Sequence, residues 1–170
     1  HFWTEAEEQA RKEYEELVYI PMTSGLSGSC ASAIMFAKEF KGKVQVVDNH
    51  RISVTQMLSV MDAVAYRNEG KSAVEIRELL EQDSLNATIY ITVNTLKYLV
   101  KGGRITPGVA MLGSLLQIKP VLTIQGEKLD TRSKARGMKA AFRTLVEHLQ
   151  EDLDTRFREY AEKGATPAAM

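Results

Sequence analysis

The chain has 170 residues, of which 44% are hydrophobic and 26% are charged, and its 22 basic residues balance its 22 acidic residues. A domain of this length buries about 70% of its unfolded surface, so its core needs neither disulfides nor a metal. The single cysteine, Cys30, excludes an internal disulfide, and three scattered histidines without CxxC or HxxxH spacing exclude an ordinary zinc site. The zero net charge argues against nucleic-acid binding, and no apolar run approaches the ~18 residues of a membrane span. We expect a reducing, cytoplasmic compartment, with no membrane insertion and no metal.

In the first half of the chain, short apolar runs alternate with helical patterns. A polar helix over residues 4–16 starts with Thr4 and Glu7 at the spacing of a capping box. The pattern then predicts strands over 17–20, 44–47 and 87–93, and helices over 31–40, 55–68 and 72–82. Strands that alternate with helices favour a parallel sheet covered by helices.

The second half starts with a helical run over 95–101 that Gly102 caps, and Pro107 suits the first turn of a helix reaching residue 116. Residues 120–124 and 128–131 predict a hairpin. One long amphipathic helix follows, with its stripe at Met138, Phe142, Leu145, Leu149, Leu153 and Phe157. We therefore predict a single α/β domain over residues 1–163, with a mainly parallel sheet, and a flexible tail over 164–170.

The first candidate site is the small-residue loop 23–29, which joins a predicted strand to a predicted helix. Ligands of open α/β sheets bind at such carboxyl ends of strands. The loop's hydroxyls, together with free N–H groups at the helix start, are suited to holding an oxyanion. Serine, threonine and glycine are equally what a tight turn and an N-cap prefer, so the composition also fits a purely structural loop.

The second candidate is the segment Asp48, Asn49 and His50, again after a strand. A hydrolase would pair Ser27 with His50 and Asp48, but residues two apart at a strand end seldom have the geometry of a triad. The alternative is a turn with a solvated histidine.

The third candidate is the turn 101–107, where two glycines precede Arg104 and Pro107. Between residues 97 and 143 there are ten lysines and arginines against two acidic residues. This local excess favours an anionic ligand or an acidic partner, although an exposed arginine after a helix cap explains the turn equally well. The apolar residues Met111, Leu112, Leu115 and Ile118, with Met57, are core by default, but they would also suit an acyl chain.

Three stretches together resemble the DegV family of bacterial fatty-acid-binding proteins. They are Thr-Ser-Gly-Leu-Ser-Gly at 23–28, Leu-Lys-Tyr-Leu-Val-Lys-Gly-Gly-Arg-Ile at 96–105, and Leu-Gly-Ser-Leu-Leu-Gln-Ile-Lys-Pro-Val-Leu at 112–122. The match runs from about Phe2 to Asp152. It implies a two-part α/β fold with one long-chain fatty acid between the parts, whose carboxylate is presented to a separate fatty acid kinase for acyl-phosphate formation. It also implies that this chain lacks the family's first strand and its final histidine-bearing segment.

By position, the resemblance places Ser24, Gly25, Ser27 and Gly28 at the fatty-acid carboxylate and Arg104 near the head group or the kinase surface. It implies no cofactor, no catalytic residue and no activity of the chain's own. Two other functions stay open: a serine hydrolase acting on lipid esters through Ser27, and an interaction module with a basic docking face. If terminal segments are missing, we expect exposed apolar surface, and either a homodimer of the shortened chain or much weaker fatty-acid binding than in a chain restored at both ends.

Overall fold

The computed structural model describes residues 14–112, 117–124 and 128–162 of the chain. The chain divides into two compact units, residues 1–87 and 88–170, and each unit is described by itself. The first unit is built on β1 (Leu17–Tyr19) and β2 (Val44–Val46), which pair in parallel with Leu17 opposite Val44. In the described residues, its helical elements are α2 (Ser29–Ala37), the 3-10 turn η1 (Lys38–Phe40), α3 (Ser53–Asn68) and α4 (Ala73–Gln82).

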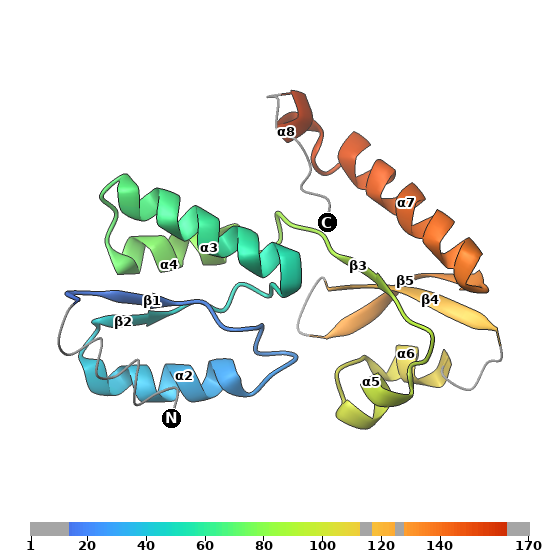
Figure 1. Cartoon of the computed structure of the whole chain (residues 1–170), viewed down its shortest axis with the longest axis horizontal. Coiled ribbons are helices and arrows are strands. Elements are labelled where there is room, and N and C mark those ends of the chain that lie inside the picture. The colour runs from blue at the N-terminus through green and yellow to red at the C-terminus, as the bar shows by residue number, and fades with distance from the viewer. Residues whose placement is uncertain (1–13, 113–116, 125–127, 163–170) are drawn as a thin grey trace. The chain divides into compact units, whose positions relative to one another are not determined.

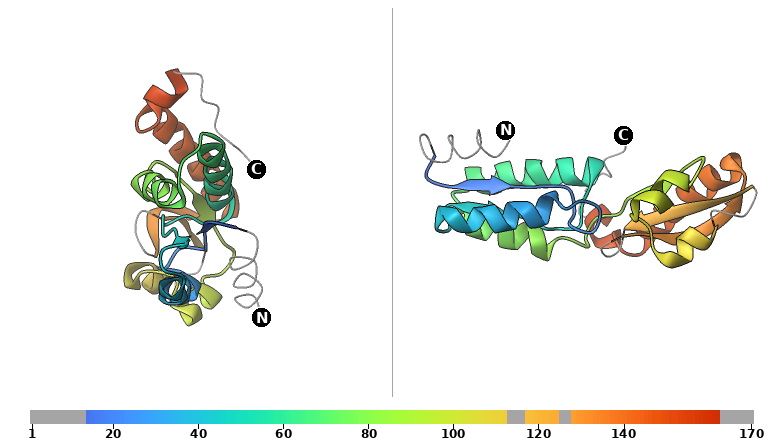
Figure 2. Two further views of the ribbon diagram at one scale, coloured as in Figure 1. Left: turned by 90° about the vertical axis from the view of Figure 1, so that its left-hand side faces the viewer. Right: turned by 90° about the horizontal axis from the view of Figure 1, so that it is seen from below.

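The first unit has three layers, with α2 on one face of the strands and α3 and α4 on the other (Figure 1). Seen from below, α2 lies in front of the strands (Figure 2). Alternate residues of β1 serve the two faces: Leu17 and Tyr19 pack with Cys30 of α2, and Val18 packs with Leu80 of α4. Because helices cover both faces of the strands, these strands are apolar apart from Gln45 of β2, as parallel strands usually are.

The second unit contains an antiparallel sheet in the order β3 (Tyr90–Thr92), β4 (Ile118–Ile124) and β5 (Leu129–Arg136). The long helix α7 (Met138–Asp154) packs on one face of this sheet, and α6 (Pro107–Leu112) packs on the other (Figure 1). The remaining described helices are α5 (Lys97–Gly102) and α8 (Arg158–Glu162). A register shift between Val121 and Leu122 of β4 marks a bulge in the pairing with β5.

The α/β fold class is confirmed, and every strand predicted from the sequence is present. Parallel pairing is found for β1 and β2, whereas β3, β4 and β5 are antiparallel. For β4 and β5 the cause is simple, since they follow each other closely and a short connection can join only antiparallel neighbours. The single domain predicted over residues 1–163 stays a prediction. The tail 164–170, the start of the helix expected over 4–16 and the end of the helix expected to reach 116 lie outside the described residues.

Two glycines adopt backbone conformations that other residues rarely reach. Gly103 ends α5 with φ +67°, so the left-handed cap is Gly103 and the prediction of Gly102 was wrong by one residue. Gly137 joins β5 to α7 with φ +80° and ψ +161°, a combination that is almost exclusive to glycine. The abrupt change from strand to helix at this point therefore depends on Gly137. Among the described helices, none is both long enough and apolar enough to cross a bilayer.

Candidate functional site

The first two candidate segments meet at the carboxyl ends of β1 and β2. One hydrogen bond joins them directly, from the Ser24 N–H to Asp48 Oδ1 at 3.1 Å. Two more join the residues beside them: the Thr23 N–H donates to the Arg51 carbonyl at 3.2 Å, and Gln56 Nε2 donates to the Ile20 carbonyl at 2.9 Å. Adjacent parallel strands end at the same edge of a sheet, which is where open α/β sheets bind ligands. The loop 23–29, called the serine loop below, therefore lies beside Asp48.

The serine loop is organised around Thr23, which is only 1% exposed. The Thr23 carbonyl accepts from the N–H groups of Leu26 and Ser27, each at 3.1 Å, and Thr23 Oγ1 accepts from the Gly25 N–H at 3.4 Å. The Ser29 N–H donates to Ser27 Oγ at 3.2 Å. With the bond from Ser24 to Asp48, the backbone donors of residues 24–27 and 29 all have acceptors within the protein. Among the N–H groups at the helix start, that of Ser29 is therefore already bonded within the loop, and the use of this helix start as an anion cradle stays a prediction.

The serine loop offers its hydroxyls to a ligand. Ser24 and Ser29 are exposed, Ser27 is half-buried, and the Ser27 and Ser29 hydroxyls are 2.9 Å apart. The space beside the Cα of Gly28 is open for at least 4 Å, so a ligand can approach the backbone there. A hydroxyl both donates and accepts, so the loop fits an uncharged polar group as well as an anion.

The charge next to the serine loop is negative. The Asp48 N–H donates to Glu81 Oε1 of α4 at 3.2 Å, which brings a second carboxylate to the end of β2. Burial, followed by the charge of Asp48 and a hydrogen bond to Asp48, raises the pKa of the Cys30 thiol to about 11, so Cys30 is a neutral thiol. In the part of the chain that the structure describes, no lysine, arginine or histidine forms an ion pair with Asp48.

The structure does not assemble the triad of the hydrolase hypothesis. Ser27 Oγ is bonded to Ser29, and Asp48 Oδ1 is bonded to the Ser24 N–H. His50 has a left-handed backbone with φ +57°, and its buried Nδ1 atom lacks a hydrogen-bond partner among the described residues. A nucleophile must be bonded to its base, and the base must be oriented by its acid, but neither contact is present here.

A buried arginine holds the second segment, and no pattern in the sequence indicates this role. Arg51 is 5% exposed, and its Nη2 atom donates to the Asp83 carboxylate at 2.7 Å and to the Asp83 carbonyl at 2.6 Å. Ser59 Oγ accepts from Arg51 Nη1 at 3.1 Å and from Asn49 Nδ2 at 2.8 Å. The Arg51 carbonyl in turn accepts a hydrogen bond from the Thr23 N–H, so this network also holds the first residue of the serine loop in place. Only the fold brings α4 to Arg51, so a linear pattern does not reveal the contact.

Arg104 belongs to the second unit, at the turn predicted from the sequence. Its side chain is exposed and folds back so that Nη1 donates to the Gly102 carbonyl at 2.6 Å. Its backbone is fixed, because its N–H donates to the Leu99 carbonyl and its own carbonyl accepts from the Leu129 N–H. A side chain on Gly102 would meet Arg104 Nη1 at 2.6 Å, which gives the glycine a local role. A rigid turn with an exposed guanidinium is suited to contacting an anion.

The residues expected to line an acyl chain differ in exposure. Leu112 is buried and Ile118 is half-buried, whereas Met57 of α3 and Met111 of α6 are 43% and 77% exposed. Leu115 lies outside the described residues. Their role as an acyl lining stays a prediction.

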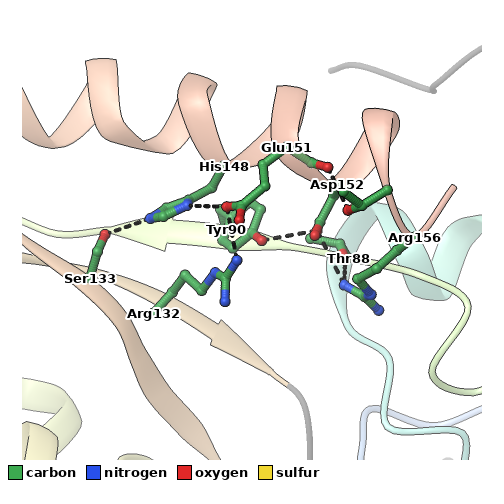
Figure 3. Close-up of polar contacts among 9 residues, drawn as sticks. Thr88, Tyr90, Arg132, Ser133, His148, Glu151, Asp152 and Arg156 are labelled. Carbon is green, nitrogen blue, oxygen red and sulfur yellow. Dashed lines mark hydrogen bonds and ion pairs between the residues drawn. The ribbon is translucent and has the colours of Figure 1, made fainter. Parts of the chain in front are cut away.

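The second unit holds a polar network between α7 and the sheet that the sequence did not reveal (Figure 3). The buried Asp152, 3% exposed, accepts from the Tyr90 hydroxyl at 2.9 Å and pairs with Arg156 at 3.1 Å. His148 lies between Ser133 Oγ at 2.8 Å and Glu151 Oε2 at 3.2 Å, and Arg132 pairs with the same Glu151 oxygen at 2.9 Å.

This network joins β3, β5 and α7 through hydrogen bonds to charged groups, which are among the stronger ones in proteins. Burial, together with a hydrogen bond to Asp152, raises the pKa of Tyr90 to about 12. The order of Ser133, His148 and Glu151 superficially matches a nucleophile, a base and an acid. However, Ser133 lies within a paired strand and Glu151 is shared with Arg132, so the arrangement is better explained as a structural link.

Comparison with known families places this geometry in context. A family model described as "Uncharacterised protein, DegV family" matches residues 3–161. A DegV domain-containing protein of Deinococcus radiodurans is 36% identical over 148 residues, which cover 87% of this chain and 53% of that protein. A relative from Lactococcus lactis is 36% identical over 149 residues, covering 84% of this chain and 52% of its own length. The chain thus spans about half the length of these relatives.

Solved structures are similar over the same extent. A structure described as fatty acid binding of a DegV family protein from Thermus thermophilus has a TM-score of 0.76 at 31% identity, covering 88% of this chain and 53% of the other. A fatty acid binding DegV family protein from Streptococcus agalactiae has a TM-score of 0.76 at 28% identity, with 87% and 53% covered. A DegV lipid binding protein from Thermotoga maritima has a TM-score of 0.73 at 30% identity, with 89% and 52% covered.

Proposed function

This chain belongs to the DegV family, and from that premise we propose that it takes part in holding a long-chain fatty acid, whose carboxyl group is bound by the hydroxyls of Ser24 and Ser27. The observation that carries the proposal is the serine loop, which lies at the carboxyl ends of two parallel strands with open space beside Gly28. Relatives of similar fold, from Thermus thermophilus and Streptococcus agalactiae, are described as binding fatty acids.

The proposed role is that of a carrier in a reducing, cytoplasmic compartment, without chemistry of its own. The absence of such chemistry is supported by Ser27, whose hydroxyl is hydrogen-bonded to the Ser29 hydroxyl and not to a base that would activate it as a nucleophile. The carrier would present the carboxyl group to a fatty acid kinase. Arg104 is the residue we propose for that contact, since it is exposed on a turn whose backbone is fixed by hydrogen bonds.

Native mass spectrometry of the purified chain tests the carrier against its alternatives. A co-purified or added fatty acid that survives in the gas phase supports the carrier. Covalent labelling of Ser27 by a fluorophosphonate would instead support the serine hydrolase and contradict our proposal. If the chain shows neither fatty-acid binding nor labelling, the interaction module with a basic docking face is the remaining hypothesis.

A further inference from the structure

Arg51 connects the serine loop to the helices that pack behind it. Its carbonyl accepts a hydrogen bond from the Thr23 N–H at 3.2 Å, while its side chain, 5% exposed, donates to Ser59 of α3 and to Asp83 after α4. The guanidinium is therefore withdrawn from a ligand at the loop. We propose that Arg51 is a positioning residue for the fatty-acid head group, which sets the affinity by holding the serine loop in its binding geometry. This inference rests on the proposed function.

The serine loop is attached to the rest of the first unit through Thr23, which is 1% exposed. The Thr23 carbonyl accepts from the N–H groups of Leu26 and Ser27, each at 3.1 Å, and the Thr23 hydroxyl accepts from the Gly25 N–H at 3.4 Å. Of the two serines proposed to bind the head group, Ser24 follows Thr23 directly and Ser27 is hydrogen-bonded to it. A shift of Thr23 would therefore move both hydroxyls.

The segment that receives the Thr23 N–H has an unusual backbone. His50 is left-handed with φ +57°, and Ser53 is left-handed with φ +52°. Residues other than glycine seldom adopt this conformation, and they keep it where the surrounding structure holds them in it. Arg51 lies between these two residues in the chain. The position of its carbonyl opposite Thr23 therefore depends on what maintains the backbone on either side.

Side chains on both sides of His50 supply that hold. Asn49 Nδ2 and Arg51 Nη1 donate to the same Ser59 Oγ atom, at 2.8 and 3.1 Å. Arg51 Nη2 donates to the Asp83 carboxylate at 2.7 Å and to the Asp83 carbonyl at 2.6 Å. A guanidinium can serve these three acceptors because its donors are spread over a rigid plane, whereas an ammonium group is a single point. Lysine at position 51 would keep the charge beside Asp83 and lose part of this set.

A positioning role and a purely structural role of Arg51 have different consequences for binding. If Arg51 reaches the ligand through the serine loop, its effect on affinity must depend on the hydroxyls of that loop. Residues that act through one shared contact have non-additive effects, whereas independent residues have additive ones. A purely structural Arg51 would lower the melting temperature and leave the affinity of the folded chain unchanged.

The experiment is a double-mutant cycle with decanoate, a soluble fatty acid, titrated by calorimetry at a temperature at which circular dichroism shows every variant to be folded. Its members are the unmodified chain, Arg51→Lys, the pair Ser24→Ala with Ser27→Ala, and the three substitutions together. We expect Arg51→Lys to weaken binding at least fivefold when the two hydroxyls are present and less than twofold when they are absent. The control is Ile76→Val in the core beside α4, which should lower the melting temperature but keep the decanoate affinity within twofold.

An affinity that Arg51→Lys leaves unchanged, or a loss of equal size with and without the two hydroxyls, would overturn the inference while leaving fatty-acid binding intact. If the unmodified chain does not bind decanoate, or the serine pair binds it as tightly as the unmodified chain, the proposed function fails and the inference fails with it. Should Arg51→Lys not fold, Asp83→Asn takes its place, because it keeps an oxygen acceptor for the guanidinium and removes the charge. The expected loss is then at least threefold and again confined to the chain with both hydroxyls, and an additive loss or none overturns the inference.

Discussion

At the scale of single residues, the contacts that join separate elements are hydrogen bonds between pairs of polar residues. Asp48 and Ser24 join two strand ends, Arg51 and Asp83 fix the segment behind them, and Tyr90 and Asp152 link a sheet to a helix. In the last two pairs one member, Arg51 or Asp152, is buried, and an unmatched buried polar group costs about 1–3 kcal/mol. Removing the exposed partner of such a pair should therefore lower the free energy of unfolding by more than an ordinary surface substitution does.

Tyr90→Phe should lower the free energy of unfolding by about 1.5–3 kcal/mol, because it removes a hydrogen bond to the buried carboxylate of Asp152. The folded-state pKa of Tyr90 is raised to about 12, above its ordinary value of 10. The unfolded chain thus loses this proton first, and the stability contributed by Tyr90 is complete below pH 10 and lost between pH 10 and 12. Urea denaturation from pH 7 to 11 measures both effects.

Tyr98→Phe is the matched control for Tyr90→Phe, since Tyr98 is 73% exposed in the same unit. It should leave stability nearly unchanged. Equal effects of the two substitutions would show that the Asp152 contact contributes nothing specific.

Arg104→Ala should leave the melting temperature within a degree or two of the unmodified chain, because the side chain is exposed and surface substitutions usually change stability little. If Arg104 contacts the kinase or the head group, acyl-phosphate formation with a fatty acid kinase should fall at least tenfold. Arg104→Lys should restore activity only in part, because the planar fork is lost. An Arg104→Ala variant that unfolds would show that the arginine is structural.

At the scale of elements, local signals predicted most of the fold. The strand-loop-helix order of the first unit, the helix start at Pro107 and the hairpin of β4 and β5 were all predicted, since each depends on nearby residues. What the sequence could not supply was pairing over distance. The partner of β3 is β4, more than 25 residues later, and no local pattern distinguishes this antiparallel contact from a parallel one.

The long helix illustrates the same limit. The apolar stripe predicted a helix through Phe157, and α7 runs from Met138 to Asp154. Yet Phe142 of that stripe is 57% exposed, while the charged Asp152 is buried. Periodicity indicates a face, but burial depends on what packs against it. For the site, likewise, the serine loop was found from its composition, whereas its contact with Asp48 required the sheet.

The capping box at the start of α4 provides a test at this scale. Ser72 Oγ accepts from the Glu75 N–H at 3.3 Å, and Glu75 Oε2 accepts from the Ser72 N–H at 2.8 Å. Ser72→Ala should therefore destabilise the first unit by about 0.5–2 kcal/mol in chemical denaturation. Ser84→Ala, on the half-buried turn after α4, should cost less. If Ser72→Ala lowers the free energy of unfolding no more than Ser84→Ala does, the capping box does not stabilise α4.

At the scale of the whole molecule, exposed apolar residues are conspicuous on helices of both units. Met57, Val60, Met61 and Val64 recur at helical spacing on α3, and each is more than 40% exposed. On α7, Phe142, Val146 and Leu149 also recur at helical spacing, and each is at least 40% exposed. Contiguous apolar patches of this kind mark interaction surfaces. We propose that in the isolated chain they pair two copies.

Light scattering should accordingly give the mass of a homodimer at tens of micromolar chain. Val146→Glu, which places a charge in the middle of the α7 stripe, should shift the chain toward the monomer, whereas Glu147→Gln beside it should not. A chain that remains monomeric at these concentrations would contradict the proposed pairing.

The most direct test of the central claim compares fatty-acid affinity with the serine loop intact and disabled. Each lost hydroxyl contact costs about 1 kcal/mol, so Ser24→Ala with Ser27→Ala should weaken decanoate binding by at least tenfold at pH 6. Ser32→Ala, exposed on α2, should bind like the unmodified chain, and all three proteins should melt at nearly the same temperature. Unaltered affinity of the double variant would contradict the assignment of the head-group site to the serine loop.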